Sequence, residues 1–200
     1  LGLVGESGSG KTSLGKAILQ LHKPTSGTVI YNDINLCNLN QKEIKNIRKE
    51  IQLIFQDPYS SLDPRRTIGF TIIEPLLMQE KIDKKFKKQK TRELLELVGL
   101  NNTYENRYPH EFSGGERQRI GIARALSTKP KFLVADEPVS ALDVSIQAQI
   151  INLIKELQSK FNLTILFISH DLRIVKYLSD KIAVMYLGKI VEIAGSDNLF

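Results

Sequence analysis

The sequence predicts an α/β fold, in which helices flank a largely parallel sheet and a helical subdomain is inserted into the chain. Short apolar segments with strand character alternate with helical patterns over most of the 200 residues. Between residues 57 and 130 this alternation stops, and the pattern indicates helices only. We therefore expect residues 1–56 and 131–200 to form one core that carries residues 57–130 as a helical subdomain.

Six segments have the length and apolar content of strands. They are residues 1–4, 28–31, 51–55, 132–135, 163–168 and 181–187. Apolar residues recur at helical spacing in other segments and predict helices there. These segments are residues 11–21, 67–79 with an interruption at Pro75, 83–98, 113–126 and 143–160.

The composition is that of a globular protein, with 42% apolar and 25% charged residues. The longest apolar segments are far shorter than the roughly 20 residues of a membrane-spanning helix. The single cysteine, Cys37, cannot form an internal disulfide, and no leader peptide is recognisable, so we expect a cytosolic compartment. Because the sequence starts at Leu1, inside an apolar strand, we expect a piece of a longer protein, truncated at both ends.

The net charge of +6 is concentrated in one segment. Residues 81–90 contain six lysines and a single aspartate. Such a charge can indicate nucleic acid, an anionic membrane surface or a phosphate ligand as a partner. We favour a solvated helix face over a dedicated binding patch.

A glycine-rich phosphate-binding loop lies between the first predicted strand and the first predicted helix. Glycines let the backbone N–H groups point at phosphate oxygens, and the helix N-terminus adds the positive end of its dipole. We expect Lys11 to reach the β- and γ-phosphates and Thr12 to bind Mg²⁺. The candidate binding residues are Gly5, Glu6, Ser7, Gly8, Ser9, Gly10, Lys11, Thr12 and the adjacent Ser13.

Two adjacent carboxylates, Asp136 and Glu137, follow the apolar segment 132–135. Carboxylates at the exit of a buried strand are unfavourable unless a metal ion or a proton transfer requires them. We predict that Asp136 holds Mg²⁺ through water and that Glu137 is the general base. An acidic pair at a strand end also occurs without a function, but the phosphate loop upstream favours the functional interpretation.

A second glycine-rich segment opens the predicted helix 113–126. Ser113 and Glu116 have the spacing of a capping box. Capping does not explain Gly114 and Gly115, because each glycine destabilises a helix by roughly 1 kcal/mol relative to alanine. The serine hydroxyl, the free N–H groups and the helix dipole together predict another anion site. The Asn-Lys-x-Asp motif of guanine-specific proteins is absent from the sequence.

With these motifs the sequence resembles the ATP-binding-cassette family, whose signature reads Ser-Gly-Gly-Gln. The resemblance covers nearly the whole chain and implies ATP and Mg²⁺ as cofactors. It implies that Gln56 contacts Mg²⁺ and the attacking water, and that His170 reads the γ-phosphate. It also implies that residues 140–143 meet another subunit.

The family works as head-to-tail pairs, in which the phosphate loop of one cassette and the signature of the other enclose each ATP. The resemblance therefore places Ser113, Gly114, Gly115 and Glu116 at a nucleotide held by a partner. Glu116 departs from the family's glutamine; we expect it to be tolerated, although an acid near the γ-phosphate could slow closure. The aromatic residue that stacks on adenine in the family lies upstream of the phosphate loop, outside this chain.

Longer stretches resemble the ATPase subunits of oligopeptide and dipeptide importers. These stretches are residues 54–65, 108–112, 139–147 and 184–192. The resemblance implies a peripheral protein at the cytoplasmic face of the inner membrane. Its implied partners are a second ATPase subunit, identical or related, transmembrane permease subunits and, indirectly, an extracytoplasmic solute-binding protein.

Three alternatives remain. Importers of nickel or of another small solute share the same stretches. A cassette that acts on nucleic acid is disfavoured, because no sustained heptads of a long coiled coil occur between Thr12 and Ser113; we expect no nucleic-acid partner. An inactive regulatory module is disfavoured by the presence of Glu137.

Overall fold

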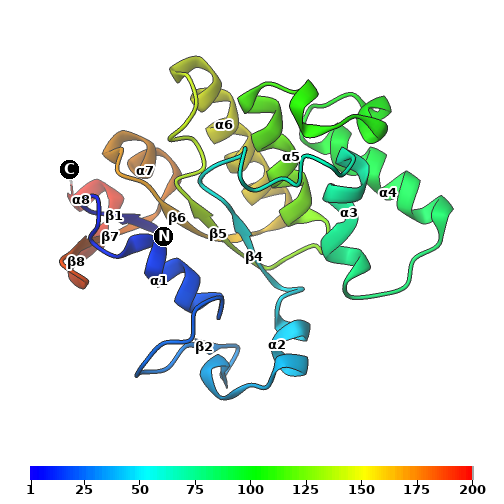
Figure 1. Cartoon of the computed structure of the whole chain (residues 1–200). Helices are drawn as coiled ribbons and strands as arrows, with labels where there is room; N and C mark the ends of the chain where they lie inside the picture. Colours follow the sequence, from blue (N-terminus) through cyan, green and yellow to red (C-terminus); the bar gives the residue numbers. More distant parts are fainter. Residues whose placement is uncertain (200) are drawn as a thin grey trace.

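A computed structural model describes residues 1–199. A six-stranded sheet with the order β4-β5-β6-β1-β7-β8 forms its centre (Figure 1). Strands β4, β5, β6, β1 and β7 pair in parallel in this order, and β8 joins β7 in antiparallel orientation. The strands are β1 (Gly2–Val4), β4 (Ile51–Ile54), β5 (Phe132–Asp136), β6 (Thr164–Ile168), β7 (Lys181–Tyr186) and β8 (Lys189–Gly195).

Helices cover both faces of this sheet, because successive side chains of each strand point to opposite faces. On β5, Val134 packs in one apolar cluster with Leu19, which follows α1 (Lys11–Ile18). The neighbouring Leu133 belongs to the other cluster, together with Ile150 of α6 (Val144–Phe161). These buried strands confirm the predicted α/β architecture.

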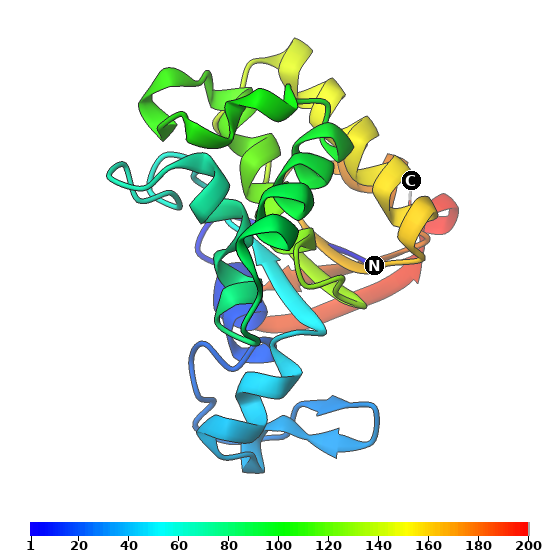
Figure 2. The same ribbon diagram turned by 90° about the vertical axis from the view of Figure 1, so that its right-hand side faces the viewer.

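Between β4 and β5 the described chain contains helices and no strand. Figures 1 and 2 show this helical part (green) beside β4 and α6, on the side opposite the segment that carries β2 and α2. Its buried side chains come mainly from α3, α4 and α5 and include Ile72, Leu95 and Ile120. The elements are α3 (Ile68–Leu77), α4 (Lys84–Leu97), η2 (Asn102–Asn106), η3 (Pro109–Glu111) and α5 (Gly114–Leu126).

The expected interruption at Pro75 is wrong, because α3 contains Pro75 and continues to Leu77. Proline removes one backbone donor from the helix. The helix continues beyond it, since the N–H of Met78 still donates to the carbonyl of Glu74 at 3.0 Å.

The predicted strand at residues 28–31 exists as β2 (Ile30–Tyr31), but it lies outside the main sheet. It pairs in antiparallel orientation with β3 (Ile34–Asn35). Asn32 and Asp33 have φ angles of 48° and 62°, as a tight two-residue hairpin requires. This hairpin keeps β2 with its neighbour in sequence instead of with the parallel strands.

The remaining elements are short, and the sequence patterns did not predict them. They are η1 (Leu36–Asn38), α2 (Gln41–Ile47), α7 (Leu172–Leu178) and α8 (Ser196–Leu199). None of the helices in residues 1–199 combines the length and the apolar character of a membrane span.

Candidate functional site

The sheet order brings four chain segments to one edge. Strands β4, β5, β6 and β1 are adjacent and parallel, so the loops that follow them leave from the same side. These loops carry Gln56, the pair Asp136 and Glu137, His170, and the glycine-rich segment that ends at Lys11. The candidates therefore converge although they lie far apart in the sequence.

The glycine-rich loop curls around the amine of Lys11, the first residue of α1. Lys11 Nζ donates to the carbonyl oxygens of Gly5 at 2.9 Å and Glu6 at 2.8 Å, and the residue is only 6% exposed. Gly10 caps the helix with a φ of 103°, which favours glycine. A Cβ at Gly5 would lie 2.1 Å from the carbonyl oxygen of Met185, so the strand β7 also requires glycine here.

Thr12 and Asp136 meet behind this loop. Thr12 Oγ1 donates to Asp136 Oδ1 at 3.0 Å, across the end of β6. Asp136 is 6% exposed. Burial raises the pKa of Asp136 above its ordinary value, the hydroxyl of Thr12 opposes this shift, and the adjacent Glu137 carboxylate adds to it. A cation beside Asp136 would relieve this unfavourable charge.

The oxygen atoms of Thr12 and Asp136 fit Mg²⁺, which prefers hard oxygen ligands. Residues 1–199 contain no group of three or more His, Cys, Asp or Glu side chains that could hold a metal ion alone. Mg²⁺ is usually bound by one or two protein ligands together with substrate phosphates and water. The two side chains therefore suit an ion that arrives with a nucleotide.

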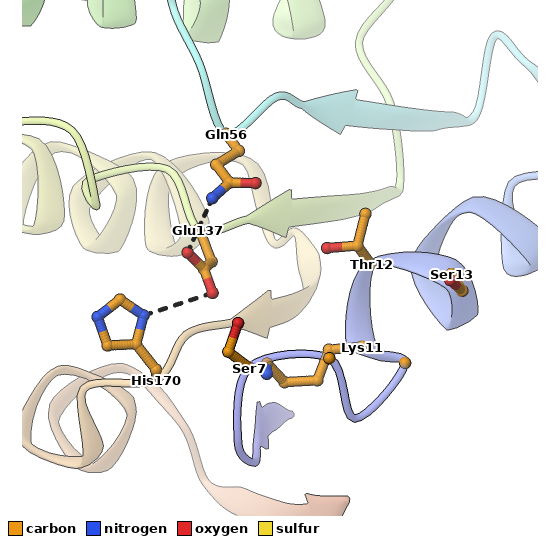
Figure 3. A pocket seen from close by; sticks show the side chains of 9 residues that line it. Ser7, Lys11, Thr12, Ser13, Gln56, Glu137 and His170 are labelled. Atoms are coloured by element: carbon orange, nitrogen blue, oxygen red, sulfur yellow. Dashed lines mark hydrogen bonds and ion pairs between the residues drawn. The ribbon is translucent and has the colours of Figure 1, made fainter. Parts of the chain in front are cut away.

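Glu137 is held by side chains from two other loops (Figure 3). Gln56 Nε2 donates to Glu137 Oε2 at 3.0 Å, and His170 Nδ1 lies 3.4 Å from Glu137 Oε1. The Glu137 backbone has a φ of 44°, a left-handed conformation that costs about 1–3 kcal/mol for a residue other than glycine. The backbone N–H of Glu137 donates to the carbonyl oxygen of Ile168, the last residue of β6, at 2.9 Å. This hydrogen bond fixes the backbone conformation of Glu137.

These residues surround an open cavity of about 450 Å³. The Glu137 side chain is 17% exposed and that of His170 63%, so both remain in contact with solvent. A carboxylate in this position can accept a proton from a water molecule in the cavity. The lining residues are Ser7, Gly8, Gly10, Lys11, Thr12, Ser13, Gln56, Glu137 and His170, all of which are candidates from the sequence.

The other candidates lie outside this cavity. Gly5, Glu6 and Ser9 belong to the loop but do not line the cavity. The segment from Ser113 to Glu116 opens α5 in the helical part of the chain. The site residues thus form two separate groups: a loop cluster (the cavity residues with Asp136) and a helix tip (Ser113 to Glu116).

The two glycines of the helix tip have a packing role within this chain. A Cβ at Gly115 would lie 2.5 Å from Ile146 Cγ2, and one at Gly114 would lie 3.2 Å from Leu142 Cδ2. The close approach that these glycines permit is therefore made by α6 and the segment before it. A ligand is not required to explain these glycines.

Two arginines of α5 contact the segment around Gln56, and sequence reasoning missed them. The Arg117 guanidinium lies 3.9 Å from the centroid of the Tyr59 ring. Arg124 donates from Nη1 to the carbonyl of Ser61, and its guanidinium lies 5.3 Å from the centroid of the Phe55 ring. Burial lowers the pKa of Arg124, which remains cationic because its ordinary value is so high. No spacing in the sequence signals these contacts, because they depend on how α5 packs against the segment after β4.

Comparison with known proteins identifies the family. Residues 1–140 match the family model described as ABC transporter. The chain belongs to the ABC transporter family. The family predicted from the motifs is thereby confirmed, and so is the expected cassette fold.

The oligopeptide transport ATP-binding proteins OppF and AppF of Bacillus subtilis (strain 168) are similar to this ABC chain. OppF is 55% identical over 202 residues and AppF 52% over 201 residues. In both comparisons the whole ABC chain is covered, together with 66% of OppF and 61% of AppF. The chain thus spans less than two thirds of the length of these relatives.

Among solved structures, the ATP-binding cassette MJ0796 has the same fold with a TM-score of 0.87 and 29% identity. The comparison covers 98% of the ABC chain and 84% of MJ0796. That structure is described as the dimeric, post-hydrolysis state bound to ADP and Pi.

Proposed function

We propose that the chain is the ATP-binding and ATP-hydrolysing part of a peptide importer that works at the cytoplasmic face of the inner membrane. The observation that supports ATP hydrolysis best is the loop cluster, in which a phosphate loop, a buried aspartate and a solvent-accessible glutamate surround one cavity. The names of OppF and AppF, at more than half identity, support peptides as the cargo.

In the proposed reaction, Lys11 and the backbone N–H groups of the loop bind the β- and γ-phosphates. Thr12 and Asp136 would hold Mg²⁺, and the ion would supply positive charge that offsets the charge of the phosphates. Glu137 accepts the proton of the attacking water, while Gln56 and His170 orient its carboxylate. The water oxygen forms a bond to the γ-phosphorus, the bond to the β-phosphate oxygen breaks, and ADP and phosphate result.

We further propose that two subunits pair head to tail. The helix tip lies apart from the cavity in its own chain, which supports a role at the nucleotide of a second ATPase subunit, identical or related. The dimeric state of MJ0796 agrees with such a pair. Permease subunits would then convert closure and opening of the pair into transport, with a solute-binding protein delivering the cargo.

The substitution Glu137→Gln tests the proposed chemistry. Glutamine keeps the size of the side chain but cannot accept the proton, so we expect turnover to fall by about 100-fold or more. Nucleotide binding should persist, because Lys11 and Thr12 are unchanged. Steady-state phosphate release and titration with a fluorescent nucleotide measure the two quantities.

Glu156→Gln is the matched control, because Glu156 lies exposed on α6. It removes the same charge and should leave turnover unchanged. Unchanged turnover in Glu137→Gln would refute the assignment of the base.

Uptake measurements test the cargo. A strain without the gene should lose uptake of labelled short peptides and regain it with the wild-type gene, but not with the Glu137→Gln variant. Loss of nickel uptake with normal peptide uptake would favour the alternative of a metal importer. ATPase activity stimulated by DNA or RNA in a salt-dependent manner would favour a cassette that acts on nucleic acid.

A further inference from the structure

We propose that Glu116 is a positioning residue that restrains Ser113: its carboxylate holds the hydroxyl proton of Ser113 within the helix tip and so weakens ATP-driven pairing. This inference rests on the proposed function, because it assumes that Ser113 meets the nucleotide of a second subunit. It goes beyond that function because it assigns to one residue of this chain the role of weakening ATP-driven pairing.

The contacts of Ser113 support this restraint. Ser113 Oγ donates to Glu116 Oε2 at 2.8 Å, and the backbone N–H of Ser113 donates to the same oxygen at 2.9 Å. In return, Ser113 Oγ accepts from the backbone N–H of Glu116 at 3.4 Å. A serine hydroxyl has one proton, and that proton is engaged here. A phosphate oxygen of a partner's nucleotide requires a donor and would have to compete with Glu116 for it.

The charge of Glu116 acts in the same direction. Among residues 1–199, the hydrogen bonds of the Glu116 side chain are all made with Ser113, and this side chain forms no ion pair. A carboxylate without an ion-pair partner, three residues from Ser113, repels a phosphate that approaches the helix tip. The same carboxylate stabilises α5, because a negative charge is favourable at a helix N-terminus. Glu116 therefore stabilises α5 and disfavours the binding of an anion at the helix tip.

The substitution Glu116→Gln separates the effect on the stability of α5 from the effect on phosphate binding at the helix tip. Its carbonyl oxygen can still accept the Ser113 N–H, so the capping box is preserved. A hydroxyl bonds to a carboxylate about twice as strongly as to a neutral acceptor, so the proton of Ser113 is released more easily. Glu116→Gln should therefore tighten pairing while it slightly lowers the unfolding temperature. A purely structural role predicts only the second change.

A second capping box in the chain provides a matched control. In α2, the N–H of Asn40 donates to Glu43 Oε2 at 2.8 Å, as the N–H of Ser113 does to Glu116. The side-chain oxygen of Asn40 carries no proton, and α2 lies on the other side of the molecule from the helix tip (Figure 2). Glu43→Gln removes the same charge from the same motif without freeing a hydroxyl.

The experiment measures ATP-dependent dimerisation of the full-length protein by analytical ultracentrifugation. The parent carries Glu137→Gln, which prevents turnover during the measurement. With Mg²⁺ and ATP, we expect the dimer dissociation constant to fall about tenfold on adding Glu116→Gln, and to remain unchanged on adding Glu43→Gln. An unchanged constant for Glu116→Gln, or equal effects of both substitutions, overturns the inference.

Ser113→Ala completes a double-mutant cycle with Glu116→Gln. Without the hydroxyl, only the charge of Glu116 remains to be removed, so the gain from Glu116→Gln should shrink. If Glu116→Gln lowers the dimer dissociation constant by the same factor with and without Ser113→Ala, Glu116 does not act by holding the hydroxyl proton of Ser113.

Different results would refute the head-to-tail pair and the restraint of Ser113 by Glu116. If the parent does not dimerise with ATP, the head-to-tail pair itself is wrong. If the parent dimerises and Ser113→Ala weakens the dimer while Glu116→Gln has no effect, only the restraint is wrong.

Discussion

The loop cluster and the helix tip differ in what holds them. Thr12 bonds to Asp136 and Gln56 bonds to Glu137, so the loop cluster is joined by contacts between residues far apart in the sequence. The side-chain hydrogen bonds of Ser113 are made to Glu116, three residues away. The sheet therefore organises the loop cluster within one chain, whereas the side-chain hydrogen bonds at the helix tip are local and Ser113 is exposed. This difference agrees with the proposal that the helix tip serves another subunit.

Among the substitutions that compare the two groups, Lys11→Ala should change nucleotide affinity most, and Ser113→Ala is its counterpart in the helix tip. Lys11 provides a buried cation to the cavity, and loss of charged hydrogen bonds of about 1.5–3 kcal/mol lowers nucleotide affinity roughly 10- to 100-fold. Ser113→Ala should change the nucleotide affinity of the separate subunit by less than about twofold, because Ser113 does not line the cavity.

Titration with a fluorescent nucleotide at low protein concentration measures both affinities. Circular dichroism shows whether each variant is folded. Equal losses for the two substitutions would remove the distinction between the two groups of residues.

A smaller effect is expected from Arg124→Lys, which addresses the connection between the two groups. Arg124 bonds to Ser61 and lies over Phe55, so it holds the segment that carries Gln56. Lysine keeps the charge but loses the planar guanidinium. We expect kcat to fall about tenfold at unchanged nucleotide affinity, because the orientation of Glu137 by Gln56 is relaxed.

Arg173→Lys is the control for this substitution, since Arg173 is exposed on α7 and pairs locally with Asp171. It should leave kcat unchanged. A change of nucleotide affinity alone in Arg124→Lys would show that Arg124 does not act through Gln56.

The smallest effect concerns an ion pair outside both groups. Glu50 lies 3.0 Å from Lys131 Nζ and accepts from the hydroxyl of Tyr31 at 2.9 Å. The bond to Lys131, followed by that to Tyr31, lowers the pKa of Glu50 below its ordinary value of 4.5. A lowered folded-state pKa contributes stability above pH 4.5 that is lost as the pH falls through the folded-state pKa.

Glu50→Gln should therefore lower the free energy of unfolding at pH 7 by less than about 1 kcal/mol, since the pair is partly exposed. The difference from wild type should diminish below pH 4.5. Urea denaturation at several pH values measures it. A constant difference at all pH values would contradict the assignment, and ATPase activity should remain unchanged throughout.

The sequence alone predicted the parts of the site that are local motifs. The phosphate loop and the pair Asp136 and Glu137 were identified from a few consecutive residues and the strands before them. Gln56 and His170 were found only through the family resemblance, because the strand order β4-β5-β6-β1 differs from the chain order. Without that order, nothing in the sequence places either residue beside Glu137.

Elements without a distinctive pattern were missed for physical reasons. Strand β8 is largely exposed, so its side chains do not show the regular alternation of a half-buried strand. Its hairpin turn uses Leu187 and Gly188 with φ angles of 43° and 80°, instead of the usual Asn-Gly pair. The contacts of Arg117 and Arg124 depend on how α5 packs against the segment after β4, and no spacing in the sequence reveals that packing.

Mixing two variants with impaired ATP hydrolysis tests the shared site most directly. Subunits with Lys11→Ala have an intact helix tip, and subunits with Ser113→Ala have an intact loop cluster. In a head-to-tail pair of one of each, one of the two sites receives both intact parts. The account predicts that each variant alone hydrolyses ATP slowly and that the mixture recovers activity. A mixture no more active than the average of its two components would contradict it.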